Sequence, residues 1–284
     1  MEQGVNKYHT HISAKRAWFD LKLRELWRYR DLVMLFTKRN FILVYKQTIL
    51  GPLWILLQPL MTTLIYAFVF GGIAGISTNG APKLLFYLGG TALWGFFSTC
   101  LTKTSTTFSA NARIFGRVYF PRLVTPISTV FSAGISFGVQ FLLFIVFFAY
   151  YIIVGEVMPN YIGILLLPFI LLYLGVLGMG LGLIITALTT KYRDLAMLVT
   201  YGVQLWMYIT PIVYPASTVA DSQFYPLIML NPVTCAVETF RWTFLGVGEL
   251  NLTYWLISIC ITITVAFLGI IIFNRVEKTF MDTI

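Results

Sequence analysis

The chain has 284 residues, of which 58% are hydrophobic and 11% charged, and its mean hydropathy is +0.81. Soluble domains carry about a quarter charged residues, so this composition excludes a water-soluble domain and indicates a protein whose solvent is lipid. The 20 basic and 11 acidic residues give a formal charge of +9. In a membrane protein such an excess concerns orientation first, and we expect no nucleic acid partner.

Residues that bind metals or form disulfides are few. The three cysteines, Cys100, Cys235 and Cys260, lack the short spacing of a zinc site and are an odd number, which excludes a full disulfide framework. The two histidines, His9 and His11, lie in a polar segment, where solvation is more usual than metal binding. The sequence therefore predicts no metal site.

The first 50 residues form a basic region that is interrupted by charge and does not read as a cleavable signal peptide. Within it, residues 15–36 predict a helix lying on the membrane surface, because aromatic and aliphatic residues mark one face and lysines and arginines the rest. Two interpretations stay open for this helix: a plain surface anchor or a gating element. The remaining residues, 51–284, are expected to form the membrane domain.

Six apolar stretches are long enough to cross a bilayer, since each crossing needs about 20 residues. None contains Asp, Glu, Lys, Arg or His, and they span residues 53–74, 84–101, 123–154, 161–189, 195–214 and 252–273. The fourth contains Gly178 and Gly182, a GxxxG pair whose usual role is close helix packing. The predicted fold class is an all-α integral membrane protein with six transmembrane helices.

Charge is distributed unequally between the connecting segments. Eighteen of the 20 basic residues fall in one set, made of residues 1–50, 102–122, 190–196 and 274–284. By the positive-inside rule this set is cytoplasmic, so both termini are expected in the cytoplasm.

The segment 102–122 mixes hydrophobic and basic residues and contains no acidic residue. A short helix ending near Gly116 would allow Ile114 and Phe115 to insert into a groove on a partner. The alternative is that the cations of this loop serve only as a positive-inside anchor.

The fifth stretch carries Tyr201 and Tyr208 seven residues apart, hence on one helix face, with Trp206 and Tyr214 nearby. Aromatic rings with hydroxyl tips suit weak binding of a neutral glycan, so these four are our candidates for a channel lining. For any single aromatic residue, an interface belt or a lipid-facing position is the more common role.

The segment 215–251 contains an apolar stretch that is broken at Asn231-Pro232 and carries Glu238 and Arg241. Two charges at a helix centre disfavour a seventh span, whereas short re-entrant half-helices covered by protein or water fit. Glu238 and Arg241 are three residues apart and share a helix face, so we expect them to pair or to face protein or a wet vestibule. The alternative is that they mark the water interface of a short surface helix.

Several chemistries are missing from the sequence. It has no GxxxxGK[ST] motif for ATP phosphates, no Ser/His/Asp set, no HExxH and no carboxylate pair within a span. The spans also lack the ionisable groups that ion-coupled transporters use. An enzyme is therefore disfavoured, and a transporter of this kind would take its energy from a partner ATPase on the cytoplasmic face.

Several motifs in chain order resemble those of permeases in ATP-binding-cassette polysaccharide exporters, most closely the O-antigen (Wzm-type) permeases, with capsule and teichoic-acid permeases as near relatives. The matching segments cover nearly the whole chain: YKQT (45–48), LGPLW (50–54), QP (58–59), VYFPR (118–122), KYRD (191–194), Asn231-Pro232 with Glu238 and Arg241, and RVEKTFMD (275–282).

The resemblance implies a homodimer of permease chains with two nucleotide-binding subunits, which would hold ATP and magnesium; this chain itself would bind no cofactor. It implies a bacterial inner-membrane location, contact with membrane lipids, and export of an undecaprenyl-diphosphate-linked polysaccharide. It also implies three sites, here assigned by residue: a coupling helix (Asn111, Arg113, Ile114, Phe115, Arg117), a cytoplasmic gate (Arg28, Arg30, Lys46, Gln47) and a periplasmic gate (Asn231, Pro232, Glu238, Arg241).

Two other functions remain open at this point. A small-lipid or drug exporter of the same architecture would differ in the compounds that stimulate its ATPase. A membrane-embedded glycan-handling enzyme would form product without any partner.

Overall fold

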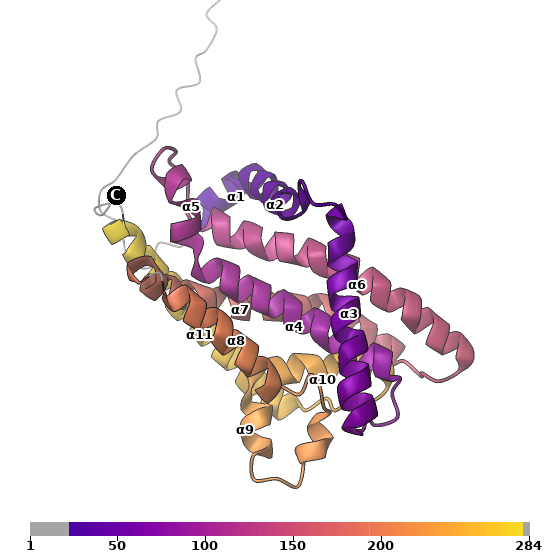
Figure 1. Ribbon diagram of the computed structural model, residues 1–284. Helices are drawn as coiled ribbons and strands as arrows, with labels where there is room; N and C mark the ends of the chain where they lie inside the picture. The colour runs from indigo at the N-terminus through magenta and orange to yellow at the C-terminus, as the bar shows by residue number, and fades with distance from the viewer. Residues whose placement is uncertain (1–22, 193, 281–284) are drawn as a thin grey trace, which may run out of the picture.

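The computed structural model describes residues 23–192 and 194–280, and every regular element within these ranges is helical (Figure 1). The predicted 15–22 part of the surface helix and residues 281–282 of the last motif lie outside the described residues. The α-helices, in chain order, are α1 (Leu23–Arg28), α2 (Arg30–Tyr45), α3 (Trp54–Phe68), α4 (Lys83–Ser105), α5 (Thr107–Phe115), α6 (Val124–Val154), α7 (Leu167–Lys191), α8 (Leu195–Ile209), α9 (Tyr225–Leu230), α10 (Pro232–Leu245) and α11 (Leu252–Phe280).

Five of the described helical segments are long and apolar enough to cross a membrane, and they coincide with five of the six predicted stretches. They are Gly51–Ile73, Lys83–Ser105, Val124–Val154, Gly163–Lys191 and Leu252–Glu277. The predicted stretch 195–214 contains α8, which is apolar but has only 15 residues. Length alone therefore does not establish a sixth span.

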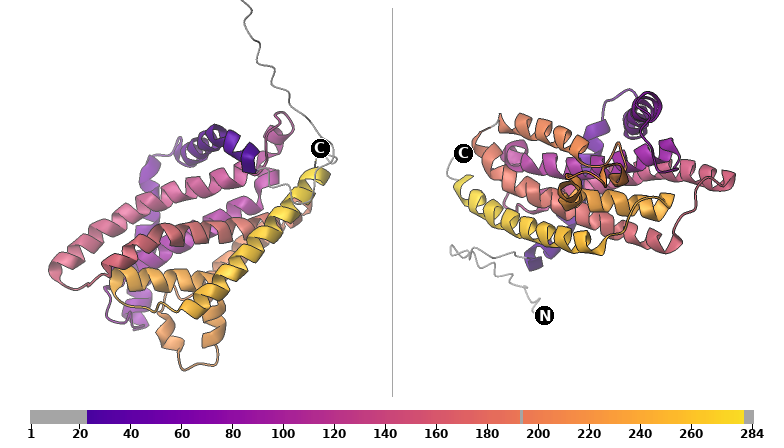
Figure 2. Two further views of the ribbon diagram at one scale, coloured as in Figure 1. Left: turned by 180° about the vertical axis from the view of Figure 1, so that it is seen from behind. Right: turned by 90° about the horizontal axis from the view of Figure 1, so that it is seen from below.

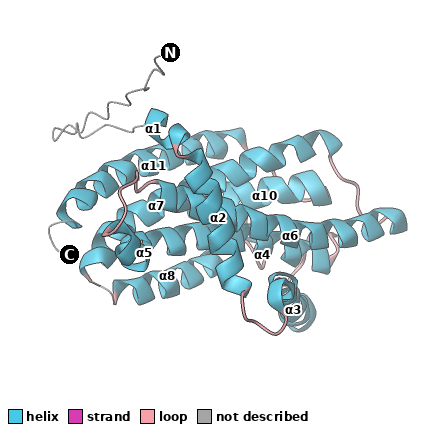
Figure 3. Cartoon of the chain, turned by 90° about the horizontal axis from the view of Figure 1, so that it is seen from above, coloured by secondary structure: helices cyan, strands magenta, loops and turns pink. Residues whose placement is uncertain are grey.

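The bundle is built around α4. In its most apolar stretch 72% of the residues are buried within the chain, against 11% for the span that contains α3. Helices α6 and α7 pack against α4, α11 packs against α7, and α2 lies across α6. Helix α3 stands at the edge of the bundle at a steep angle to the others, as the end-on view of it in Figure 3 shows.

Close helix packing depends on small residues in α7. A Cβ atom added to Gly182 would lie 2.7 Å from the carbonyl oxygen of Leu101, and one added to Gly178 would lie 2.9 Å from that of Phe97. Both positions face α4, so the predicted packing role of this GxxxG pair is confirmed.

The helix bundle has two ends, and different helices lie at each. The α2–α5 end carries α1, α2, α5 and the last turns of α11, and the α9–α10 end carries α9, α10 and the beginning of α4 (Figures 1 and 2). The described parts of the segments that the charge distribution places in the cytoplasm lie at the α2–α5 end (Figures 1 and 2).

Two helices extend beyond their predicted limits. The surface helix was expected to end at Phe36, but α2 continues to Tyr45. Its polar residues beyond Phe36 pack against α6, since Asn40 Nδ2 donates to Ser128 Oγ at 3.5 Å and Thr37 Oγ1 to the Ser128 carbonyl at 3.4 Å. Likewise α4 runs to Ser105, so Lys103 belongs to that helix and not to the following loop.

Candidate functional site

The predicted break at Asn231-Pro232 is present and has a defined structure. The Asn231 side chain caps α10 by accepting a hydrogen bond from Val233 N at 3.2 Å, and its Nδ2 donates to Thr210 Oγ1 at 2.8 Å. Pro232 is the first residue of α10, where the missing N–H has no helical partner to lose. Its carbonyl accepts a hydrogen bond from the Tyr173 hydroxyl at 3.0 Å. The break is thereby tied to the end of α8 and to α7.

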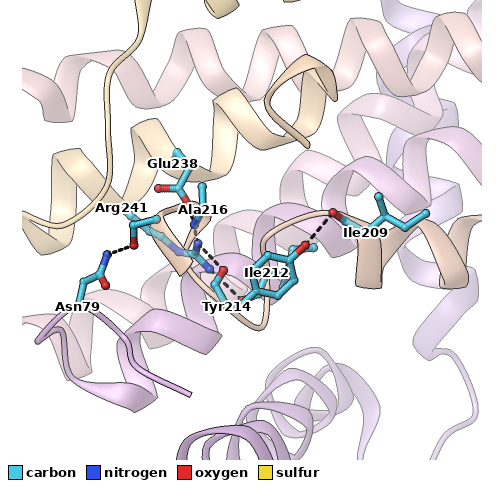
Figure 4. A network of polar contacts seen from close by, with 8 residues as sticks. Asn79, Ile209, Ile212, Tyr214, Ala216, Glu238 and Arg241 are labelled. Atoms are coloured by element: carbon cyan, nitrogen blue, oxygen red, sulfur yellow. Dashed lines mark hydrogen bonds and ion pairs between the residues drawn. The ribbon is translucent and has the colours of Figure 1, made fainter. Parts of the chain in front are cut away.

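Glu238 and Arg241 form a buried ion pair one turn apart on α10, at 2.8 Å between Glu238 Oε1 and Arg241 Nη1 (Figure 4). The residues are only 2% and 1% exposed. Arg241 also donates from Nη2 to the Ile212 carbonyl at 2.8 Å and from Nη1 to the Tyr214 carbonyl at 3.3 Å. Its guanidinium carbon lies 3.7 Å from the centre of the Phe86 ring. The predicted pairing is confirmed, and the surface-helix alternative is wrong because both side chains are buried.

The ion pair organises the non-helical segment that follows α8. Glu238 Oε1 accepts a hydrogen bond from Ala216 N at 3.3 Å, while Arg241 binds the two carbonyls just before it. The same segment is held on its other side, where Asn79 Nδ2 donates to Ser217 Oγ at 2.8 Å. Backbone groups that cannot pair within a helix thus find charged partners, which is the condition for irregular backbone inside a membrane protein.

Three glycines allow the chain to approach this ion pair. A Cβ atom on Gly90 would lie 3.4 Å from the Ile212 carbonyl oxygen, one on Gly89 only 2.5 Å from Phe240 Cε1, and one on Gly248 only 2.8 Å from the Glu238 carbonyl oxygen. Gly248 also has a φ of +108°, which other residues rarely adopt. Sequence reasoning missed all three, although an adjacent pair of glycines inside an apolar span was a signal of close approach.

The aromatic residues predicted to line a channel are not on one surface. Tyr201 and Tyr208 are 66% and 49% exposed, on the outer face of α8. Trp206 instead packs edge-on against Trp94 and Phe97 of α4, with ring centres 6.2 and 5.3 Å away. Tyr214 lies beyond the helix, and its hydroxyl donates to the Ile209 carbonyl at 3.0 Å (Figure 4). Trp206 is half-buried and packs against the core, so it does not share the exposed surface of Tyr201 and Tyr208, and the channel lining itself stays a prediction.

At the opposite end, α5 stops at Phe115 and Gly116 is its C-cap, as the sequence predicts. Phe115 is only 3% exposed, and its ring centre lies 5.8 Å from that of Phe108 and 5.7 Å from that of Phe120. The prediction that Phe115 inserts into a partner is therefore wrong: it fills a core cluster of its own chain. Ile114 is half-buried and packs against the same cluster.

The surface that α5 and the residues after it leave exposed is basic and aromatic. Arg113 and Arg117 are exposed, and so are Val118 and Tyr119, at 58% and 69%. Asn111 is half-buried and its Oδ1 accepts a hydrogen bond from Arg39 Nη2 at 3.4 Å. A partner that docks here would meet these arginines and Tyr119 before it met Ile114.

Arg122 connects α5 to both α6 and α11. Its Nε lies 3.8 Å from Glu277 Oε1, and its Nη1 donates to the Glu277 carbonyl at 3.2 Å. The guanidinium carbon is 5.2 Å from the centre of the Phe115 ring and 5.8 Å from that of Phe108. Phe108 in turn stacks on Phe273 of α11 at 4.8 Å. Sequence reasoning noted the motifs of Arg122 and Glu277 but not that they meet.

The four residues assigned to a cytoplasmic gate lie in two places. Arg28 and Arg30 flank the beginning of α2, and the Arg30 Nε lies 3.9 Å from Asp31 Oδ1. Lys46 and Gln47 follow its end. All four are exposed, and the 16 residues of α2 separate the two pairs by about 24 Å at 1.5 Å per residue.

The described part of the chain contains no group of three His, Cys, Asp or Glu residues arranged to hold a metal ion. Cys100 and Cys235 are buried free thiols, and Cys260 is an exposed one.

Comparison with known proteins agrees with this architecture. Residues 31–245 match the family model described as the ABC-2 type transporter. Two proteins of Klebsiella pneumoniae named O-antigen export system permease protein RfbA are each 29% identical over 252 residues, which is 89% of this chain and 94% of the relative. A protein of the same name from Myxococcus xanthus is 28% identical over 223 residues, 78% of this chain and 83% of the relative.

Proposed function

The chain belongs to the ABC-2 type transporter family, and we propose that it is the permease subunit of an exporter that moves a lipid-linked polysaccharide of the O-antigen type across the bacterial inner membrane. The observation that carries this proposal is the similarity to O-antigen export permeases over nearly the full length of the chain. ATP and magnesium bind a separate subunit, and hydrolysis there supplies the energy.

The residue chemistry supports an external energy source. The sequence has no phosphate-binding P-loop, and the six predicted stretches contain no ionisable residue for proton or ion coupling. The buried charges at the α9–α10 end are paired with each other, as in a structural or gating element.

In this function α8 is the fifth of six spans. Its 15 helical residues measure about 22 Å, short of the roughly 30 Å hydrocarbon core. Turns and bends continue the chain from Thr210 toward α9, and Arg241 binds the Ile212 and Tyr214 carbonyls, so these two backbone groups have partners where the chain would complete the crossing. Six crossings return α11 to the α2–α5 end, in line with two cytoplasmic termini and the 18 basic residues assigned there.

The cytoplasmic face would be the α2–α5 end, with α5 as the coupling element. Arg122 and the ring cluster of Phe108 and Phe115 link α5 rigidly to α6 and α11. Movement of a docked ATPase would therefore reach these two helices together, and the exposed Arg113 and Arg117 would supply the contact.

The α9–α10 end would be the periplasmic gate, with α9 and α10 as re-entrant half-helices. In the homodimer, the exposed Tyr201 and Tyr208 face of α8 would be available to line a channel shared with the second copy. Trp206 would support that face from behind.

The test is ATP-dependent export by the purified chain and its ATPase in proteoliposomes, with a fluorescent lipid-linked O-antigen as cargo. We expect cargo to become accessible to an added glycosidase only when ATP and magnesium are present. Transport of small lipids or drugs without transport of the glycolipid would contradict the proposal.

A further inference from the structure

Two adjoining clefts meet at Lys103. The larger, of about 470 Å³, lies between α3, α4 and α6, and the smaller, of about 260 Å³, lies between α2, α5, α6 and the end of α4. Lys103 lines both clefts. Because α4 extends past its predicted end, this lysine lies in the last turn of the helix and not in the cytoplasmic loop, and its exposed side chain borders both clefts.

The larger cleft is polar on each of its three main walls. Gln58 and Thr62 come from α3, Ser98 and Thr99 from α4, and Ser136 and Gln140 from α6. The hydroxyls of Thr62, Ser98 and Ser136 donate to carbonyls of their own helices, so they offer oxygen lone pairs to the cleft. Gln58 is exposed and Trp54 beside it is 45% exposed, which shows that the cleft opens to the outside of the chain along α3.

The smaller cleft contains a second cation, Arg39. Its Nη2 donates to Asn40 Oδ1 at 3.1 Å and to Asn111 Oδ1 at 3.4 Å, and its guanidinium carbon lies 4.4 Å from the centre of the Phe36 ring. Burial lowers the pKa of Arg39, as expected where a cation is withdrawn from water. Asn40, Asn111 and Phe36 are all neutral, so these contacts do not compensate the charge of Arg39.

Neither cleft has an acidic residue in its lining. Within the described chain, Lys103 forms no side-chain hydrogen bond or ion pair. Two cations that share a partly enclosed space without a carboxylate favour an anionic ligand, since partly desolvated positive charge needs a counter-charge. A neutral sugar would use the amides and hydroxyls but leave both charges uncompensated.

We propose that Lys103 and Arg39 bind the phosphate groups of the exported lipid, while its hydrocarbon chain leaves through the α3 side of the larger cleft. Gln58 and Gln140 would then contact the first sugar or the bridging oxygens, since each presents a primary amide to the same space. The identity of the lipid as the exported cargo rests on the proposed function. The two cations and the open α3 side indicate only a lipid that carries an anionic oxygen group.

The test measures lipid binding to the permease–ATPase complex in phosphatidylcholine nanodiscs by native mass spectrometry. The probes are undecaprenyl diphosphate, phosphatidylglycerol and inorganic diphosphate, with undecaprenol as the uncharged control. The variants are Lys103→Gln, Arg39→Gln and Lys103→Arg. Lys38→Gln is the matched control, because Lys38 is an exposed cation on the same helix as Arg39 and lines neither cleft.

We expect Lys103→Gln and Arg39→Gln each to weaken binding of undecaprenyl diphosphate about tenfold or more, the factor for losing one hydrogen bond to a charged group. Lys103→Arg and Lys38→Gln should bind within about twofold of the wild type, as charge is kept in one and remote in the other. Unchanged binding in Lys103→Gln would overturn the proposal.

The other probes separate the sources of the phosphate. If the variants lose phosphatidylglycerol and keep undecaprenyl diphosphate, the clefts hold a bilayer lipid and the cargo assignment is overturned. If inorganic diphosphate displaces the lipid fully, the headgroup alone is recognised, which supports the site. The binding experiment and the export experiment can fail separately. If the variants bind lipid like the wild type while the wild type exports normally, this site is overturned and the proposed function stands. If the wild type does not export, the proposed function is overturned, but the binding data for the site remain valid.

Discussion

Two arginine–glutamate pairs of the described residues, one at each end of the bundle, are built in opposite ways. Glu238 and Arg241 are three residues apart on one helix, 2.8 Å from each other and buried. Arg122 and Glu277 are 155 residues apart, 3.8 Å from each other, with side chains 7% and 18% exposed. The first pair binds backbone of a neighbouring segment, and the second joins two helices and a ring cluster.

The two pairs have different roles because the backbone around them differs. At the α9–α10 end the chain between α8 and α9 contains no α-helix, so its backbone groups need fixed charges as partners in the absence of water. At the α2–α5 end the helices are complete, and the arginine serves to hold their ends in register. Loss of the first pair should unfold a region, whereas loss of the second should loosen a connection.

The largest effect is expected from Glu238→Ala. The change leaves the buried Arg241 without its counter-charge and removes the acceptor of Ala216 N, which costs about 3–5 kcal/mol for a broken buried pair. We expect a large drop in the thermal midpoint of the purified protein and loss of export. A thermal midpoint within about 2 °C of the wild type would show that Glu238 and Arg241 are not paired in the membrane.

A charge swap sharpens this result. In Glu238→Arg with Arg241→Glu the carboxylate would stand beside the Ile212 and Tyr214 carbonyls, which the wild-type guanidinium binds. Direct pairing alone predicts partial recovery, but the backbone contacts predict that the swap stays nearly as unstable as Glu238→Ala. If the swapped variant recovers the full thermal midpoint of the wild type, the contacts of Arg241 with the Ile212 and Tyr214 carbonyls contribute little to stability.

The next largest effect is expected from Gly89→Ala. The added methyl group would lie 2.5 Å from Phe240 Cε1 and 3.3 Å from Phe144 Cε2, so α10 must move away from α4, and overpacking of this kind costs about 1–3 kcal/mol. Gly95→Ala is the matched control, since a Cβ atom there meets nothing within 4 Å. Equal melting midpoints for the two variants would contradict the close seating of α10 on α4.

A smaller effect is expected at the α2–α5 end. Glu277→Gln should cost about 1 kcal/mol or less, because the pair is long and partly exposed, while Arg122→Gln should cost more, about 1–2 kcal/mol, as it also loses two ring contacts. We expect both variants to melt near the wild type but to show faster hydrogen exchange in α5. Protection of α5 at the wild-type level in Arg122→Gln would contradict its role as a connector.

Sequence periodicity and composition predicted the features that neighbouring residues determine: the long helices, the break between α9 and α10, and the ion pair within α10. Apolar length located five long helices, and Asn231-Pro232 located the break, because a proline without an N–H and an asparagine cap act on their own neighbours. The pairing of Glu238 with Arg241 was also accessible, since residues three apart on a helix share a face.

The burial of Phe115 and Trp206 depends on contacts with residues that are distant in the sequence. Phe115 was predicted to dock on a partner because it lies in a segment of mixed hydrophobic and basic residues, but Phe108, Phe120 and Arg122 contact its ring within the chain. Trp206 is near Tyr201 and Tyr208 in the sequence, but it points to another side of α8, because its ring packs edge-on against Trp94 and Phe97 of α4. No pattern in one sequence shows which distant residues provide such partners.

The smallest effect on stability, and the one most specific to docking, is expected from Arg113→Ala with Arg117→Ala. Both side chains are exposed, so the thermal midpoint should correspond to a change within about 0.5 kcal/mol. Exposed charges at an interface mainly steer association, so we expect slower binding of the ATPase and a weaker dependence of that rate on salt, measured by surface plasmon resonance. Arg30→Ala is the control, because it removes an exposed cation from the same end but away from α5. If the double variant and the control associate at the same rate, the ATPase docks elsewhere, and the rigid link through Arg122 serves the helix ends alone.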